Sequence, residues 1–189
     1  MDEPIILASA SPRRHELLSM IGLPYEVHAP QVDESETGSP EGMVLRLAHK
    51  KARAAAAVYP GRVILAADTL VYAKGEVLGK PRDEADALRM IGLLRDDWHE
   101  VYTGVCVIDR SGHEHTGADK TAVHFMPISD DEIRAYVNGG EPFGKAGAYA
   151  IQGVAGAFIS GIEGSYSNVI GLPLHLVKAL LGKAEIKLL

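Results

Sequence analysis

The sequence has little of what marks extracellular, membrane or nucleic-acid-binding proteins. It has a single cysteine in 189 residues, which excludes an internal disulfide, and the apolar run around Cys106 predicts a buried thiol. No apolar run approaches the ~20 residues of a membrane-spanning helix, and the start, Met1-Asp2-Glu3, is unlike a signal peptide. A net charge of −6 argues against nucleic-acid binding through bulk electrostatics. We therefore expect a cytoplasmic protein with no membrane or nucleic-acid partner.

Familiar catalytic signatures are also scarce. There is no Gly-x-Ser-x-Gly motif, as a nucleophile elbow requires. His113 and His115 share a strand face, but no cysteine or acidic ligand set with zinc spacing accompanies them. The segment Gly139–Ala146 nearly matches a phosphate-binding P-loop, but it follows a predicted helix and has Ala146 where a magnesium-binding hydroxyl is needed. These absences exclude the common serine hydrolase, zinc and P-loop classes.

The composition that remains, 47% hydrophobic and 23% charged, is typical of a globular chain. Hydrophobic periodicity and turn residues predict an irregular mixture of strands and helices, which indicates an α/β (α+β) fold around one mixed sheet flanked by helices, in one domain over residues 1–189. Residues 143–172 are glycine-rich, and we expect strands and tight turns there. The predicted strands are Pro4–Ala8, Glu26–Pro30, Val63–Ala67, His99–Ile108 and His115–Phe125, and the predicted helices are Pro12–Ile21, Ser39–Val58, Asp83–Leu94, Ser129–Gly139 and Leu174–Leu181.

The first strand leads directly into a helix through Ser9–Arg14. Ser11 is a good N-cap residue, and Pro12 suits the first helical position. Arg13 and Arg14 then occupy the first turn, where each cation loses on the order of 0.3–1 kcal/mol against the helix dipole. Two such cations beside free backbone donors indicate an anion site. Ion pairs with surface carboxylates are the alternative, and these residues alone do not decide between them.

Four other charged residues are candidates for the same chemistry. Asp68 follows an apolar strand and precedes Thr69, at the edge where open sheets place ligands. A carboxylate there has to be paired, hydrogen-bonded or metal-bound, unless it serves as an N-cap or in a turn. Glu34 in an acidic loop and Lys51 on a helix have solvated roles by default, and Lys80 is either a phosphate contact or a surface lysine. Cations that hold phosphates, with carboxylates that hold a hard divalent metal, are what phosphoanhydride hydrolysis requires.

Several short motifs then match one family together. In order along nearly the whole chain, these blocks resemble the Maf family of nucleoside triphosphate pyrophosphatases. Each block is weak alone, but jointly they are highly specific. The blocks are Ser9–Arg14, Val32–Glu34, Arg46–Ala48 with Lys51-Ala52, Ala67–Thr69, Leu78–Pro81, Gly144–Gly153 and Ile162–Pro173.

The resemblance implies cleavage of a nucleoside triphosphate between its α and β phosphates, giving a monophosphate and pyrophosphate, with Mg²⁺ or Mn²⁺ as cofactor. The segments Ala67–Thr69 and Ala150–Gln152 are similar to the branch that prefers dTTP and UTP, and clearance of modified pyrimidine nucleotides is a further role to expect. It also implies a two-lobed, ITPase-like molecule with a central nucleotide cleft, and a homodimer.

The family pattern assigns a role to each matching residue. Asp68 is the catalytic residue that orients or deprotonates the attacking water, and Glu34 and Asp68 hold the metal. Because a carboxylate beside several cations is a weak base, we expect metal coordination to supply much of the activation of water. An amide such as that of Gln152 offers one donor and one acceptor to a pyrimidine edge. The phosphate-binding residues are Ser9, Arg13, Arg14, Lys51 and Lys80, and the residues implied for specificity are Arg13, Thr69 and Gln152.

Two other functions are weighed against this one. A nucleotide-binding regulator of septum formation would bind without essential turnover and could lose its catalytic acid, whereas Asp68 is present here. A phosphatase would release single phosphates. The products formed from dTTP, UTP, CTP and GTP separate the three.

Overall fold

The structure, a computed structural model, describes residues 3–188. The chain divides into two compact units: Met1–Asp68 with Thr103–Asp119 and Gly171–Leu189, and Thr69–Tyr102 with Lys120–Ile170. Because three long strands contribute to both units, the division does not follow a simple cut in the sequence. Within the described residues, no helix has the length and apolarity needed to cross a membrane.

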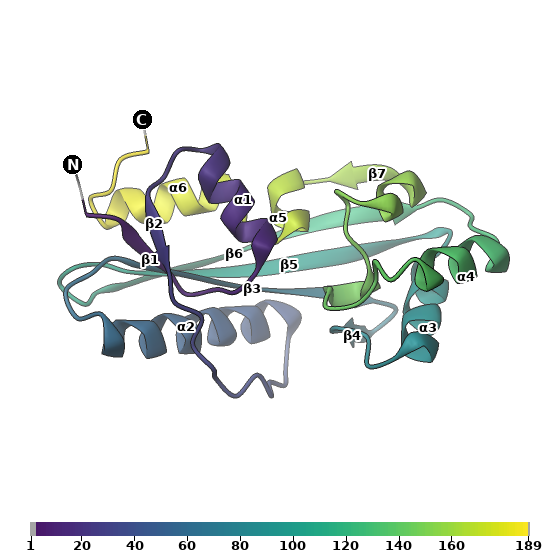
Figure 1. Cartoon of the computed structure of the whole chain (residues 1–189), viewed down its shortest axis with the longest axis horizontal. Coiled ribbons are helices and arrows are strands. Elements are labelled where there is room, and N and C mark those ends of the chain that lie inside the picture. The colour runs from purple at the N-terminus through teal and green to yellow at the C-terminus, as the bar shows by residue number, and fades with distance from the viewer. Residues whose placement is uncertain (1–2, 189) are drawn as a thin grey trace. The chain divides into compact units, whose positions relative to one another are not determined.

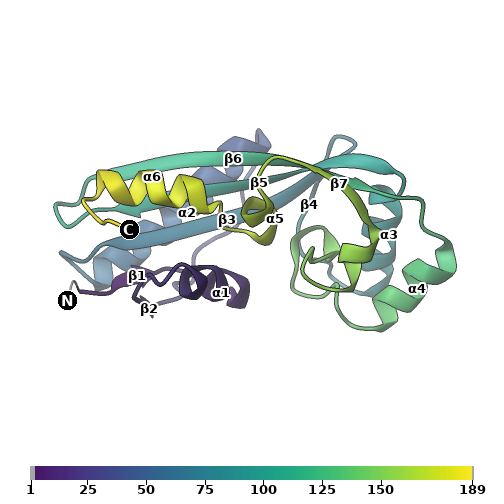
Figure 2. The same ribbon diagram turned by 90° about the horizontal axis from the view of Figure 1, so that it is seen from above.

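The first unit is a sheet with helices on both faces. Strand β1 (Ile5–Leu7) pairs in parallel with β2 (Tyr25–Val27) and with β3 (Ile64–Ala73). All of β1 is buried, as expected of a parallel strand covered on both faces. Helix α2 (Pro40–Val58) covers one face, and α1 (Pro12–Met20) and α6 (Leu174–Lys183) lie over the other (Figures 1 and 2).

Small residues let α2 approach the sheet closely. Ala48, Ala52 and Ala55 are fully buried against the strands. Gly104 of β5 (Asp97–Ile108) lies so near the helix that a Cβ there would come within 2.4 Å of the Val44 carbonyl oxygen. The close packing fixes the distance of α2 from the sheet. It therefore also fixes the backbone positions from which Lys51 and the other side chains of α2 extend. Cys106 is a free, buried thiol in this core, as predicted.

The second unit joins strand ends, two helices and several helical turns. The later part of β3 forms a hairpin with β4 (Glu76–Leu78), through Lys74 and Gly75 at φ 49° and 84°, the left-handed pair that tight hairpins need. Helices α3 (Glu84–Leu94) and α4 (Asp130–Asn138) pack together. Strand β6 (Glu114–Phe125) pairs with β7 (Ile159–Glu163). The remaining elements are η1 (Ala146–Ala148), η2 (Val154–Phe158) and α5 (Tyr166–Ile170).

Hydrogen bonds between neighbouring strands give the order β2-β1-β3-β5-β6-β7, with β4 beside β3. Parallel pairs at β1 and antiparallel pairs at β4 and β7 make this a mixed sheet. The predicted fold class, one mixed sheet flanked by helices, is therefore confirmed. The single domain over 1–189 and the central cleft between two lobes stay predictions.

The starts of the longer helices follow the sequence. Ser39 accepts a hydrogen bond from the Gly42 amide at the start of α2, and Asp83 accepts one from Asp86 at the start of α3. At α4, Ser129 and Glu132 form a reciprocal capping box. These predicted caps are confirmed, whereas Ser11, also predicted as a cap, stands at the start of α1 without a side-chain capping hydrogen bond.

Several local predictions were wrong. His113 lies before β6, which begins at Glu114, so it does not share a strand face with His115. Asp68 does not end a strand, because β3 continues to Ala73. Leu70 and Val71 are buried, and Val71 pairs with Leu78 of β4. Residues 143–172 contain helical turns besides a strand. Helix α6 passes through Gly182 to Lys183. At β3, burial and strand pairing of the residues after Asp68 outweighed the local signal of a polar pair.

Candidate functional site

The turn between β1 and α1 centres on a buried serine and a buried arginine. Ser9 Oγ accepts hydrogen bonds from the Ser11 amide at 3.2 Å and from Arg14 Nη1 at 3.0 Å. Arg14 Nε donates to the Gly171 carbonyl oxygen at 2.8 Å, beside the start of α6. The side chain of Arg14 is therefore locked between two segments far apart in the sequence, with Ser9 setting its angle.

Burial and neighbouring charge act on both arginines. Burial lowers the pKa of Arg14, while Asp68 and Glu34 oppose that shift and Arg13 adds to it. The pKa of Arg13 is lowered by burial and raised less by Glu16. Both guanidinium groups stay protonated, because arginine starts from so high a value. Two cations held partly out of water form a strong field for an anion, since screening is weaker there.

Lys51, from α2, joins the two predicted metal ligands. Its Nζ lies 2.6 Å from Asp68 Oδ1 and 2.7 Å from Glu34 Oε1. The side chains of Lys51 and Asp68 are only 13% and 16% exposed, whereas that of Glu34 is 54% exposed. One carboxylate is thus set in the sheet and the other is presented from a loop, with a cation between them. The default expectation that Lys51 is fully solvated was wrong. Glu34 is not only a solvated loop residue, because it forms an ion pair with Lys51.

The same donor set suits a hard divalent cation. Glu34 and Asp68 supply carboxylate oxygens around one positive centre, and oxygen is the ligand that Mg²⁺ takes. Among residues 3–188, no group of three or more His, Cys, Asp or Glu side chains could hold a metal ion. Mg²⁺ is commonly held by one or two carboxylates together with substrate phosphates and water. The residues fit that mode of binding, in which the substrate completes the coordination.

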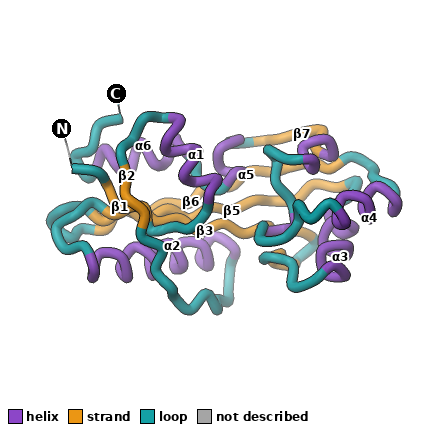
Figure 3. The backbone as a smooth tube through the Cα atoms, viewed as in Figure 1, coloured by secondary structure: helices purple, strands orange, loops and turns teal. Residues whose placement is uncertain are grey.

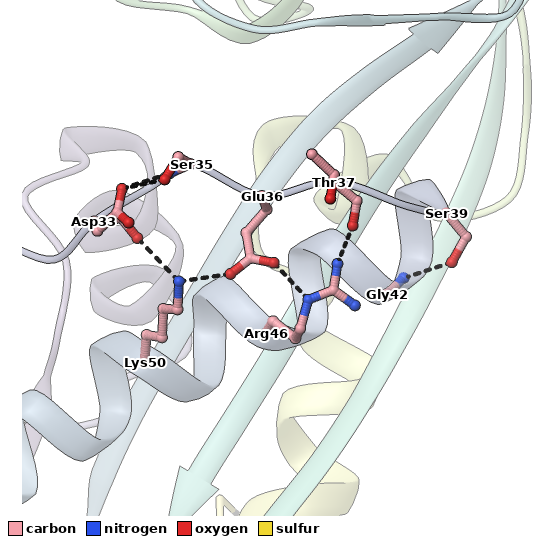
Figure 4. A network of polar contacts seen from close by, with 8 residues as sticks. All are labelled: Asp33, Ser35, Glu36, Thr37, Ser39, Gly42, Arg46 and Lys50. Carbon is pink, nitrogen blue, oxygen red and sulfur yellow. Dashed lines mark hydrogen bonds and ion pairs between the residues drawn. The ribbon is translucent and has the colours of Figure 1, made fainter.

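The loop that carries Glu34 leads into α2 (Figure 3), and a carboxylate fastens it to that helix (Figure 4). Glu36, whose side chain is 9% exposed, pairs with Arg46 and with Lys50, one helical turn apart. Arg46 also donates to the Thr37 carbonyl, and Lys50 donates to the Asp33 carbonyl at 3.3 Å. These bonds to Arg46 and Lys50 lower the pKa of Glu36. We call Glu36, Arg46 and Lys50 the loop clamp, which fixes the backbone on both sides of Glu34.

The other predicted site residues lie in the second unit. Thr69 follows Asp68 within β3 and is half-buried, while Lys80 and Gln152 are exposed in loops. The Gly147 amide donates to the Gly79 carbonyl at 3.0 Å, which ties the segment that carries Lys80 to the loop that leads to Gln152. Ser9, Arg13, Arg14, Lys51, Glu34 and Asp68 belong to the first unit. How these two groups of residues meet a common substrate stays a prediction.

Two carboxylates, those of Glu36 and Glu141, have structural roles at these loops that the sequence did not predict. Glu36 stands in an acidic run, so nothing local distinguishes it from its solvated neighbours. The side chain of Glu141 accepts hydrogen bonds from the Val154 and Ala155 amides, thirteen or more residues away. The sequence signal that could have exposed Glu36 is the i, i+4 spacing of Arg46 and Lys50, which presents two cations on one helix face.

Comparison with known sequences gives one family along nearly the whole chain. The model of the Maf-like protein family matches residues 4–184. A protein from Geotalea uraniireducens named dTTP/UTP pyrophosphatase is 53% identical over 180 residues, covering 93% of each chain. Another of that name, from Symbiobacterium thermophilum, is 50% identical over 175 residues, covering 92% of this chain and 90% of the relative.

Similarity to solved structures is weaker. A crystal structure of a nucleoside-triphosphatase / dITP/XTP pyrophosphatase from Mycobacterium abscessus aligns with a TM-score of 0.45 and 20% identity, covering 67% of this chain and 76% of that one. The sequence relatives, rather than this likeness, carry the family assignment.

Proposed function

The chain belongs to the Maf family, and from that membership and the site described above we propose that it hydrolyses dTTP and UTP to the monophosphate and pyrophosphate with a divalent metal ion. Relatives at 50% and 53% identity are named dTTP/UTP pyrophosphatase. The observation that carries the proposal is the pair of carboxylates, Glu34 and Asp68, that share Lys51 in the unit that also holds Arg13 and Arg14. Modified pyrimidine nucleotides are included in the proposed substrate class.

Charge balance supports a triphosphate as the anion. In the first unit, Arg13, Arg14 and Lys51 set three positive charges against the carboxylates of Glu34 and Asp68. A bound divalent ion makes the group strongly positive, which suits an anion carrying several charges. The cations neutralise the triphosphate and stabilise the charge that develops on the departing pyrophosphate. Ser9 holds Arg14 in its orientation, and Lys80 adds a further cation in this proposal.

Asp68 orients the attacking water and accepts its proton. The side chain projects from β3, a strand in the centre of the hydrogen-bonded order, and rigid elements hold reacting groups more accurately than loops do. Lys51 bonds one oxygen, Oδ1, so the carboxylate is fixed in rotation. Glu34 and Asp68 would hold the metal ion, which when bound lowers the pKa of water and neutralises phosphate charge.

Selection of the base falls to Gln152 with Thr69, and to Arg13 through its position. The Gln152 amide has a donor and an acceptor that match the edge of uracil or thymine. The exposed position of Gln152 in a loop leaves its amide accessible to a ligand. The structural alternative for Gln152 is a hydrogen-bonding role within its own turn, whereas Thr69 lies inside β3 rather than in a turn. A base-selectivity measurement separates base reading by Gln152 from that alternative.

The experiment is a product assay on the purified protein. dTTP, UTP, CTP and GTP are each incubated with protein and Mg²⁺ or Mn²⁺, and pyrophosphate and phosphate are measured separately. We expect pyrophosphate from dTTP and UTP, and much less from CTP and GTP. Phosphate without pyrophosphate would contradict the proposal. Tight nucleotide binding without any product would favour the alternative function, a regulator of septum formation.

We extend the proposal to assembly and location: a homodimer in the cytoplasm. The single cysteine, Cys106, is buried, and burial raises the pKa of its thiol to about 12. Such a thiol stays protonated and unreactive at neutral pH, which agrees with a reducing compartment and with its having no part in the chemistry. Light scattering during size-exclusion chromatography measures the oligomeric state directly, and a monomer would contradict that part.

A further inference from the structure

The carboxylate of Glu141 holds the start of a short helix far along the chain. Its Oε2 accepts a hydrogen bond from the Val154 amide at 2.7 Å, and its Oε1 accepts one from the Ala155 amide at 3.2 Å. These amides belong to the first residues of η2, whose N–H groups point away from the helix and need outside acceptors. A charged acceptor makes stronger bonds to such groups than a neutral one. Glu141 therefore fastens the chain immediately after Gly153.

A buried tyrosine fastens the other end of the same segment. The Tyr136 hydroxyl donates to the Ala148 carbonyl at 3.0 Å and lies 3.2 Å from Glu141 Oε1. Its side chain is almost fully buried, in the core that α4 shares with Tyr149. Ala148 and Val154 are thus held by two neighbouring side chains, that of Tyr136 in the last turn of α4 and that of Glu141 three residues after the helix ends. The five residues between these points, 149–153, include Gln152.

Within that segment the backbone folds into a turn. The Gly153 amide donates to the Ala150 carbonyl at 3.0 Å, so Ile151 and Gln152 are its central residues. A Cβ on Gly153 would come within 2.4 to 2.5 Å of the Glu141 carboxylate atoms. Because that carboxylate already accepts two amide bonds, it cannot withdraw without losing them. Glycine next to Gln152 is therefore required by Glu141.

We propose that Glu141 is the positioning residue for Gln152: it fixes the Ala150–Gly153 turn and thereby sets the selectivity for a uracil or thymine base. This rests on the proposed function, in which Gln152 reads the base. A side chain held before the ligand arrives loses less conformational entropy on binding. Loss of the Glu141 contacts weakens recognition of the matching base and leaves the phosphate-binding residues in place.

The test is Glu141→Gln, which keeps the length of the side chain and replaces one acceptor oxygen by an NH₂ donor. At least one of the groups that now donate to the Glu141 carboxylate would then face the NH₂ group of the glutamine, which is itself a donor. We expect KM for UTP and dTTP to rise about tenfold, with kcat within about threefold and KM for CTP and GTP little changed, so that selectivity falls. Gln152→Ala should show the same loss, and adding Glu141→Gln to it should cost no more.

Glu132→Gln is the matched control. Glu132 also accepts bonds at a helix start, from the Ser129 amide and hydroxyl, both at 2.7 Å. It lies in the same unit, and α4 carries none of the predicted site residues. We expect it to leave selectivity unchanged. An equal loss of selectivity in both variants would assign the effect to general destabilisation and overturn the proposal, as would full additivity with Gln152→Ala.

Hydrogen exchange tests the positioning step without any turnover. In the nucleotide-free protein, the Val154 and Ala155 amides should exchange about tenfold faster in Glu141→Gln than in wild type, and at the wild-type rate in Glu132→Gln. Unchanged exchange overturns the proposal, and so does faster exchange with unchanged selectivity. If the wild-type protein releases no pyrophosphate, the proposed function fails by itself. The ratio of equilibrium affinities for UTP and CTP then replaces the kinetic selectivity, and Glu141→Gln must narrow it.

Discussion

Lys51 shows how one residue can hold two like charges together. Its ammonium group has three donors on a flexible stem, and it contacts carboxylates from the sheet, Asp68, and from the loop, Glu34. Without a cation between them, two carboxylates so placed would repel each other. The ammonium group offsets that repulsion and holds the two carboxylates near one another, which is the arrangement that a divalent ion needs.

Asp68→Asn tests the role of the carboxylate itself. The amide keeps the shape of the side chain and an oxygen that Lys51 can bond, so the fold should persist. The variant loses the negative charge that accepts a proton and helps to hold the metal, so kcat for dTTP should fall about 10²- to 10⁴-fold. Equilibrium binding of the nucleotide should change little. Near-normal turnover with an unchanged melting curve would remove Asp68 from the catalytic role.

At the scale of elements, local sequence signals predicted where helices start, but they did not predict that strand β3 continues beyond Asp68. Ser39, Asp83 and Ser129 begin their helices as expected, because a cap depends only on residues three or so positions away. The apolar run before Asp68 was correctly read as a strand, but its continuation depends on pairing of Val71 and its neighbours with β4. The polar pair Asp68-Thr69 looks locally like the end of a strand, and only the pairing of the residues after it shows that the strand continues.

The candidate site divides in the same way. The first-turn position of Arg14 follows from Pro12, and the structure confirms it. Its hydrogen bond to the Gly171 carbonyl joins residues at opposite ends of the chain. No feature of the sequence near either residue predicts that contact. The predicted metal ligands, Glu34 and Asp68, are assigned by family resemblance, and the contact of both with Lys51 is information that only the fold supplies.

The loop clamp gives a prediction for the element that presents Glu34. Glu36→Gln removes the charge that holds Arg46 and Lys50 (Figure 4), so the loop should loosen without any change in Glu34 itself. We expect the affinity for Mn²⁺, measured by calorimetry with a non-hydrolysable nucleotide analogue present, to fall about tenfold, as for outer-shell substitutions at metal sites.

Glu114→Gln is the control for the loop clamp. Glu114 bonds Arg53 at 2.6 Å and His49 at 2.7 Å on the same helix, α2, but it comes from β6. Loss of the Glu114 charge should disturb α2 to a similar degree as loss of the Glu36 charge and should leave the Mn²⁺ affinity unchanged. Equal loss in both variants, or none in Glu36→Gln, would show that the clamp does not position Glu34.

For the molecule as a whole, stability should depend on pH through one buried histidine. His99 packs against Phe125 and Tyr149 with ring centroids 5.1 and 5.4 Å away, and its Nε2 lies 2.8 Å from the Tyr149 hydroxyl. Burial lowers the pKa of His99 from 6.5 to about 4, with Asp97 opposing the shift and His124 adding to it. Between these two values the unfolded chain binds a proton at His99 that the folded chain does not, so acid favours unfolding.

The free energy of unfolding should therefore be unaffected by His99 above pH 7, begin to fall as the pH drops below about 6.5, and be about 2 kcal/mol lower at pH 5. Urea unfolding at pH 7 and pH 5 measures this through the fluorescence of Trp98, the one tryptophan in the sequence and the neighbour of His99. His99→Gln cannot titrate and should lose much less stability over the same interval, whatever its stability at pH 7. Equal losses in the two proteins would show that other groups cause the acid sensitivity and that His99 takes up its proton without unfolding.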